Sequence, residues 1–381
     1  MQVRVPETRH GELVRALQPD PRVPDWIASL NDAAFPCQSN EFARPDKCPT
    51  PVSVTFRCFY LEELNGGTRV ILRLAGYLAE RGHSVALSAW YGDADIETVR
   101  LPNLTVRVER DVRDAEAVVA SYWPTALEVS RASLTAAKFA FLQGDEPAWP
   151  TLPEDKRQRA RQAFSLPGFR YIAVCKTLAE TCASKYGTPQ LDWLPGNGVD
   201  SIEFAPRINS HQSRNGACFI HRNVWWKGAD KALTAARRMQ ERHPQFKVYG
   251  AGFERFGSPG VEFLLNADSN TMADLYSQSD FYLSFSRFEG SPLPPLEAMA
   301  CGCIPILTSV GVEDYLVDRE NGFLVQPDDP YSAVAIMEEV LADNALRMRL
   351  QQNCLLTARS RPWSRTFEAF ESLLLKGVGI G

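Results

Sequence analysis

Short apolar runs alternate with amphipathic stretches from residue 51 onward, and this alternation predicts strands and helices in turn. Residues 1–50 are rich in proline and show no such period, so we expect an irregular extension there. In the first half, strands are predicted at 52–59, 84–90, 105–108, 117–121, 138–143 and 170–174. Helices are predicted from residue 70 to Gly82, near 124–131 and at 154–164.

The same alternation resumes after a polar stretch at residues 208–215. Strands are predicted at 217–221, 246–249, 261–264, 281–285, 305–308 and just after residue 321. Helices are predicted at 229–242, 272–278, 330–341, 345–359 and from about 363 to 375. Strands that alternate with helices indicate parallel sheets covered on both faces, so the fold class is α/β.

The length of 381 residues suits two such domains. We expect an irregular extension over residues 1–50 and a Rossmann-like domain over 51–195. A second Rossmann-like domain is expected over 196–360, followed by a helix over 361–381. Ligands of such sheets gather beyond the C-terminal ends of the strands, which places a site in the cleft that the two domains face.

Composition narrows the class of protein. The net charge of -5 argues against a nucleic-acid binder, and no apolar run approaches the roughly 20 residues of a membrane span. The N-terminus shows no apolar core of a signal peptide. The nine cysteines are scattered, often inside apolar runs, which is typical of reduced thiols and predicts a cytoplasmic protein.

Residues 286–305 carry the most informative pattern in the chain. An apolar strand is followed by a loop rich in glycine and proline and then by a helix that is expected to start near Pro294 and Pro295. Exposed N–H groups and the positive end of the helix dipole favour an anion at this point. Two carboxylates, Glu289 and Glu297, are acceptors for sugar hydroxyls, so the segment suits a sugar diphosphate.

At these residues, EGSPLPPLEAMACGCIP from 289 to 305, the chain resembles the retaining glycosyltransferases of the family-4 type. The resemblance implies the GT-B architecture, with Glu289 on the hydroxyls of the donor sugar and Glu297 on the nucleotide ribose. It also places Gly290, Ser291 and Leu293 at the donor. Relatives often have glycine where this chain has Pro292, which has no N–H to offer.

Further segments extend the resemblance over about residues 52–375. Arg222 and Lys227, five positions apart, match two cations that the family places on the donor diphosphate, where fixed cations stabilise the charge of the leaving group. In relatives the base is seated near Leu264 and Asn266. The segment 194–200 resembles the crossing between the family's two domains. In relatives, the helix that corresponds to residues 361–381 crosses back onto the first domain.

Gly66 and Gly67 form an expected turn after the first strand. The third glycine of the dinucleotide fingerprint is missing, so NAD binding is disfavoured. In the resembled family this loop lies under the donor phosphates; a tight turn without a ligand is the alternative.

Gln143 stands at a strand end where many family members carry histidine, and Asp145 follows it. A similar pattern occurs in the rhamnosyltransferase branch that builds bacterial surface glycans. Asp145 either orients an acceptor hydroxyl or caps the next turn. The basic stretch at 154–161 is either a solvated helix face or a contact with anionic lipid or a phosphorylated acceptor. Contact with lipid would put the protein on the inner face of the membrane.

The resemblance implies transfer of a sugar from a nucleotide-diphosphate sugar to a glycan or glycolipid acceptor, with no metal and no other cofactor. Three alternatives stay open. A metal-dependent transferase would use Asp93 and Asp95 as a metal clamp, and an epimerase would use the same scaffold without an acceptor. A catalytically silent partner subunit would bind the nucleotide sugar without turnover.

Overall fold

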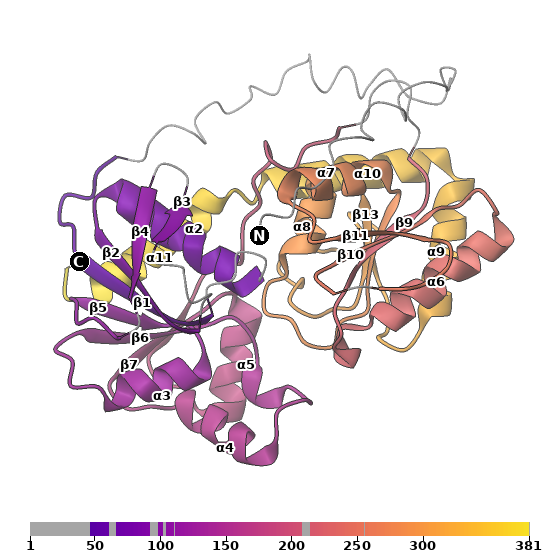
Figure 1. Ribbon diagram of the computed structural model, residues 1–381. Coiled ribbons are helices and arrows are strands. Elements are labelled where there is room, and N and C mark those ends of the chain that lie inside the picture. The colour runs from indigo at the N-terminus through magenta and orange to yellow at the C-terminus, as the bar shows by residue number, and fades with distance from the viewer. Residues whose placement is uncertain are drawn as a thin grey trace, which may run out of the picture.

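The structure, a computed structural model, describes residues 46–60, 66–91, 98–101, 104–109, 111–207, 214–254 and 256–380. Most of the predicted extension and the Asp93 and Asp95 pair lie outside these ranges. The described chain forms two α/β halves, each built on one sheet, which lie side by side in Figure 1. The predicted fold class is confirmed.

The first half is built on an eight-stranded sheet in the order β3-β4-β2-β1-β5-β6-β7-β8. All of its pairings are parallel except that of β3 with β4. Its strands are β1 (Ser53–Tyr60), β2 (Ser84–Tyr91), β3 (Thr98–Leu101), β4 (Leu104–Glu109), β5 (Ala117–Ala120), β6 (Ala137–Leu142), β7 (Phe169–Ala173) and β8 (Leu191–Trp193). Its helices are α2 (Gly66–Arg81), α3 (Trp123–Arg131), α4 (Glu154–Ala163) and α5 (Lys176–Tyr186), with a short 3-10 turn η1 (Glu146–Ala148).

The second half is built on a six-stranded parallel sheet in the order β11-β10-β9-β12-β13-β14. Its strands are β9 (Ala217–His221), β10 (Val248–Gly252), β11 (Val261–Leu265), β12 (Phe281–Ser284), β13 (Ile304–Leu307) and β14 (Phe323–Leu324). Its helices are α6 (Ala229–Arg242), α7 (Ser269–Gln278), α8 (Leu293–Ala300), α9 (Pro330–Ala342) and α10 (Asn344–Arg359), with a 3-10 turn η2 (Trp225–Lys227). No helix in the described ranges is long and apolar enough to cross a bilayer.

Burial explains why the period of the sequence predicted so many of these elements. Central strands such as β5 and β13 are buried at every position, because helices cover both faces of a parallel sheet. The prediction missed β3, α5 and β8. The buried face of α5 consists of Leu178, Ala179 and Cys182, of which only one is large, so its apolar period is weak. The three-residue β8 at a sheet edge has no fully buried position.

The last helix, α11 (Trp363–Gly377), returns to the first half (Figure 1). Trp363, Phe370 and Leu374 belong to the apolar core of the first half. A buried polar cluster fastens the same helix: Glu371 accepts hydrogen bonds from Tyr77 at 3.1 Å and Arg81 at 2.9 Å. Its Oε1 also lies 2.9 Å from Nε2 of His83. Burial raises the pKa of Glu371, but these hydrogen bonds outweigh it and the net pKa is lowered.

Replacing Glu371 by alanine is expected to loosen α11. The change leaves the guanidinium of Arg81 and the buried ring of His83 without their acid, so the free energy of unfolding should fall by about 3–5 kcal/mol. Urea unfolding measures this. Glu368→Ala, on an exposed position of the same helix, is the control and should change stability by less than about 0.5 kcal/mol. Equal effects of the two changes would contradict the role of the cluster.

Candidate active site

The predicted cations and Glu289 follow the two strands of the second half at which the strand order reverses. In this sheet β9 and β12 are neighbours, although β10 and β11 come between them in the chain. Arg222 and Lys227 come directly after β9, and Glu289 comes after β12. Crevices at such points of reversal are where open parallel sheets bind ligands.

Lys227 and Glu289 meet directly. Nζ of Lys227 lies 2.6 Å from Oε1 of Glu289 and also donates to the carbonyl of Phe288 at 3.4 Å. The loop that carries Lys227 is fixed in place by Gly228, where φ is +68° and an added Cβ would lie 2.4 Å from the carbonyl oxygen of Phe285. Only glycine fits there.

Arg222 lies close to this pair without joining it. Its guanidinium carbon is 4.0 Å from the ring centre of Phe253. Burial lowers the pKa of Arg222, while the carboxylates of Glu289 and Glu254 act in the opposite direction. A partly desolvated cation of this kind gains energy when an anion binds next to it.

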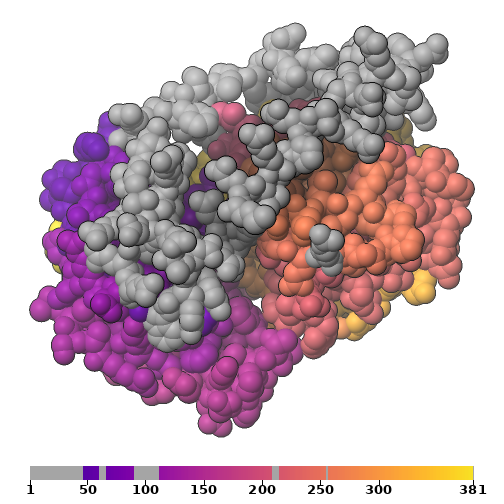
Figure 2. Space-filling view, viewed as in Figure 1, coloured from indigo at the N-terminus to yellow at the C-terminus, as the bar shows by residue number. Residues whose placement is uncertain are grey.

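The loop at 289–293 touches the first half of the molecule. A Cβ added at Gly290 would lie 2.1 Å from the carbonyl oxygen of Gln143, which follows β6. The thiol of Cys175, which follows β7, donates to the carbonyl of Gly290 at 3.2 Å. Leu293 is buried within the apolar core of the first half. The loop therefore joins the C-terminal ends of both sheets, and the two halves meet in the lower part of Figure 2.

Ser291 is held by the segment that links the two halves. The backbone N–H of Asn197 donates to Oγ of Ser291 at 2.9 Å, and the side-chain amide of Asn197 donates to its carbonyl at 2.6 Å. Gly311 packs on the other side of the loop, since a Cβ there would lie 2.6 Å from the carbonyl of Gly290. The backbone of the loop is thus fixed from three directions.

The start of α8 requires a correction. The helix begins at Leu293 with Pro292 as its N-cap, so Pro294 and Pro295 fill the second and third helical positions. Of residues 292–295 only Leu293 carries an N–H group, whereas a helix start ordinarily offers four. The expected cluster of N–H donors is therefore reduced to one, and side-chain cations must do more of the work on any anion.

Glu297, on the fifth residue of α8, faces the first half. It is 5% exposed, and its Oε1 lies 3.1 Å from Nη2 of Arg69 on α2. Burial raises the pKa of Glu297, and the charges of Arg69 and Arg73 act against that rise. Gly66 and Gly67 belong to the first turn of α2 and not to a turn before it, so they lie near this ion pair.

Three predicted residues lie apart from the pair of Lys227 and Glu289. Leu264 and Asn266 are at the end of β11, the edge strand, where the N–H of Asn266 donates to the carbonyl of Gly252 at 2.9 Å. The carboxylate of Asp145 accepts hydrogen bonds from the hydroxyl of Tyr186 and, at 2.7 Å, from Nζ of Lys185, both on α5. No contact described here links these three residues to Glu289.

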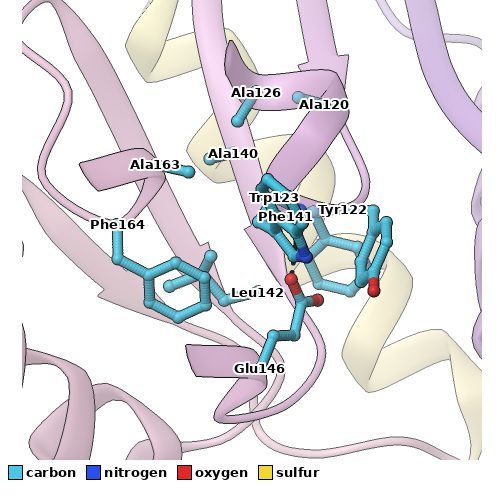
Figure 3. A pocket seen from close by; sticks show the side chains of 10 residues that line it. All are labelled: Ala120, Tyr122, Trp123, Ala126, Ala140, Phe141, Leu142, Glu146, Ala163 and Phe164. Atoms are coloured by element: carbon cyan, nitrogen blue, oxygen red, sulfur yellow. Dashed lines mark hydrogen bonds between the residues drawn. The ribbon is translucent and has the colours of Figure 1, made fainter. Parts of the chain in front are cut away.

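A second acid, Glu146, lies next to Asp145 and was not predicted. It is buried against a small apolar cavity, and Figure 3 shows its carboxylate pointing at the start of α3. The backbone N–H of Trp123 donates to Oε2 of Glu146 at 3.0 Å. Burial raises the pKa of Glu146 to about 8, so the acid is largely protonated at neutral pH.

Aromatic rings also cross between the halves. Trp149, which follows β6, stacks on Trp226 with ring centres 5.9 Å apart. In the sequence, Trp226 directly precedes Lys227. Tyr122 lies 6.2 Å from Trp149 on one side, and Phe288 lies 5.7 Å from Trp226 on the other. The pattern of the sequence marked Arg222 and Lys227 but gave no reason to pair the tryptophans.

Among the described residues, one group could hold a metal by the spacing of its ligand atoms, namely Cys48, His83 and Glu371. Its hydrogen bonds oppose that use. Nδ1 of His83 accepts the N–H of Val52 at 3.1 Å, so the neutral ring carries its proton on Nε2, which faces Glu371. The group serves to attach α11.

The comparisons with known proteins agree with this geometry. The family described as "Glycosyl transferases group 1" matches residues 200–355, the stretch that contains the pair of Lys227 and Glu289. An uncharacterized glycosyltransferase of Methanocaldococcus jannaschii is 27% identical over 208 residues, which are 48% of this chain and 53% of that protein. The chain spans about half the length of the first curated relatives it matches.

Solved structures extend the likeness of fold beyond the group 1 domain. A sucrose-phosphate synthase from Thermosynechococcus elongatus superposes with a TM-score of 0.71 at 15% identity, covering 86% of this chain and 100% of that one. The Anabaena protein HepE, in complex with UDP-glucose, gives 0.70 at 15% identity over 85% and 100%. Both halves therefore share the GT-B fold of these enzymes.

Gly290→Ala tests the contact between the loop at 289–293 and the first half. The added methyl would overlap the carbonyl of Gln143, so the halves must separate or the loop must move, at a cost of about 1–3 kcal/mol. Thermal unfolding should show the loss. Gly257→Ala is the control, because a Cβ there has no atom within 4 Å. A stability of Gly290→Ala equal to that of the control would contradict the described contact.

Glu146→Gln tests the buried acid. Between the ordinary pKa of 4.5 and about 8, folded Glu146 keeps a proton that the unfolded chain has released, so its contribution to stability falls as pH rises. The glutamine variant lacks this loss. Its free energy of unfolding, relative to that of the natural chain, should therefore rise by up to about 1.4 kcal/mol per pH unit over that window. Urea unfolding from pH 5 to 8 measures the difference.

The matched control is Glu154→Gln, since that side chain is 56% exposed at the start of α4. Its difference from the natural chain should stay constant with pH. A constant difference for Glu146→Gln as well would show that the acid is ionised in the folded protein at neutral pH.

Proposed function

We propose that the protein is a retaining, metal-independent glycosyltransferase. It moves a sugar from a nucleotide-diphosphate sugar to a glycan or glycolipid acceptor in the synthesis of a surface polysaccharide. The observation that carries the proposal is the pairing of Lys227 with Glu289 directly before Gly290, which abuts Gln143 at the end of β6. A donor held by the second half would there meet an acceptor held by the first.

The donor site is proposed at the C-terminal ends of the strands of the group 1 domain. Arg222 and Lys227 would bind the diphosphate, and Glu289 would accept hydroxyls of the sugar. Gly290, Ser291 and Leu293 would contribute the fixed backbone of the loop. Glu297 would bind the ribose, with the base near Leu264 and Asn266. Gly66 and Gly67, in the first turn of α2, would lie below the phosphates.

The proposed reaction uses the diphosphate as its own base. The acceptor hydroxyl attacks the anomeric carbon on the face that the nucleotide leaves, and the bond from that carbon to the phosphate oxygen breaks. The hydroxyl proton passes to a phosphate oxygen, and Arg222 and Lys227 stabilise the charge that develops there. No metal ion and no enzymic base take part.

The acceptor side is the less detailed part of the proposal. Asp145, held by Lys185 and Tyr186, would orient the acceptor through the turn that follows β6. Gln143 and Asp145 support rhamnose as the candidate sugar. The exposed basic side chains of α4 support peripheral contact with anionic lipid on the cytoplasmic side, which binding to anionic vesicles at low and high salt would test.

Lys227→Ala and Arg222→Ala are each expected to lower turnover about 10²-fold, because each removes a fixed charge from the leaving group. A thermal-shift screen of nucleoside diphosphates and their sugars identifies the donor first, since a ligand that binds only the folded state raises its melting temperature. Release of nucleoside diphosphate in the presence of acceptors then measures turnover.

Lys231→Ala is the control, because Lys231 is paired with Asp230 at 3.0 Å on α6 and lies outside the proposed site. Nearly full turnover in both Arg222→Ala and Lys227→Ala would reject the assignment. Three outcomes favour the alternatives: tight binding without transfer indicates a silent subunit, product without acceptor an epimerase, and loss of activity in EDTA a metal-dependent enzyme.

A further inference from the structure

One face of α2 carries a row of charged and polar side chains toward other parts of the chain. Arg69, Arg73, Tyr77 and Arg81 are spaced four residues apart, so they lie along one side of the helix. Tyr77 and Arg81 bond to Glu371 and fasten α11. Arg73 lies 2.7 Å from Glu203 in the segment between the halves and covers the ring of Trp363.

Arg69 differs from the other members of this row in what it holds. Its partner, Glu297, lies on α8 of the opposite half, one turn beyond the start of the helix at Leu293. The other three side chains bind acids that hold the fold together. Arg69 binds an acid inside the proposed donor site.

The cations and N–H donors assigned to the diphosphate in that site are few. Lys227 is paired with Glu289 at 2.6 Å, and Arg222 is the remaining predicted cation. The three prolines at 292, 294 and 295 remove N–H groups that would otherwise face the anion. A further donor of hydrogen bonds is therefore needed, and a guanidinium supplies a planar fork that matches phosphate oxygens.

We propose that Arg69 is this donor-binding residue. In the empty site it neutralises the buried carboxylate of Glu297; when a nucleotide enters, the ribose hydroxyls take over Glu297 and the guanidinium turns to the diphosphate. The exchange keeps the buried carboxylate of Glu297 hydrogen-bonded in both states, which avoids the high cost of leaving it without a partner. It also links the first half of the molecule to the bound donor.

The inference rests on the proposed function and is tested by binding, not turnover. The full-length chain is titrated calorimetrically with the nucleoside diphosphate that stabilises it most and with the matching nucleoside. Arg69→Met should weaken binding of the diphosphate at least tenfold and change binding of the nucleoside by less than threefold, because only the phosphates lose a partner. Arg69→Lys should recover part of the lost affinity.

Arg73→Met is the matched control, since it removes the same charge one helical turn away from a partner outside the site, and it should change both affinities by less than threefold. Diphosphate binding by Arg69→Met that equals that of the natural chain overturns the inference, as does an equal loss of diphosphate and nucleoside. A natural chain that binds no nucleoside diphosphate overturns the proposed function itself, together with this inference.

Discussion

The close approach of the 289–293 loop to the first half is the constraint on which the rest of the structure depends. The carbonyl of Gln143 lies where a side chain at Gly290 would be, and Leu293 packs into the first core. Because Gly290 has no side chain, the loop can approach Gln143 this closely, and the ends of both sheets come to one place. The pairing of Arg69 with Glu297 across the halves depends on that placement.

Charge in this region is arranged in pairs that a ligand could exchange. Two cations and two acids lie opposite each other, one pair within the second half and one across the halves. Of these four, Glu297 is buried, and a buried charge is stable only while it has a partner. The proline-rich start of α8 supplies few N–H groups, so recognition of an anion here depends on side chains more than on a helix dipole.

The fold was largely predictable because period and turn residues act locally; α6 even begins and ends at the predicted residues. The motif around Glu289 and the spacing of Arg222 and Lys227 located the loops of the site. Contacts between distant segments were not predictable. Nothing near Arg69 in the sequence indicates that its partner is Glu297. The burial of Glu146 could not be predicted either, because it depends on the packing of α3 against the turn that carries Glu146. The four-residue spacing of Arg69, Arg73, Tyr77 and Arg81 was the one local signal available.

The most direct test of the central claim, that one site is built from loops of both halves, is amide hydrogen exchange of the intact protein with and without its preferred nucleoside diphosphate. Our account predicts slower exchange at three separate segments together: residues 66–69, 222–228 and 289–293. Slower exchange in the second half alone, with residues 66–69 unchanged at saturating ligand, would contradict it.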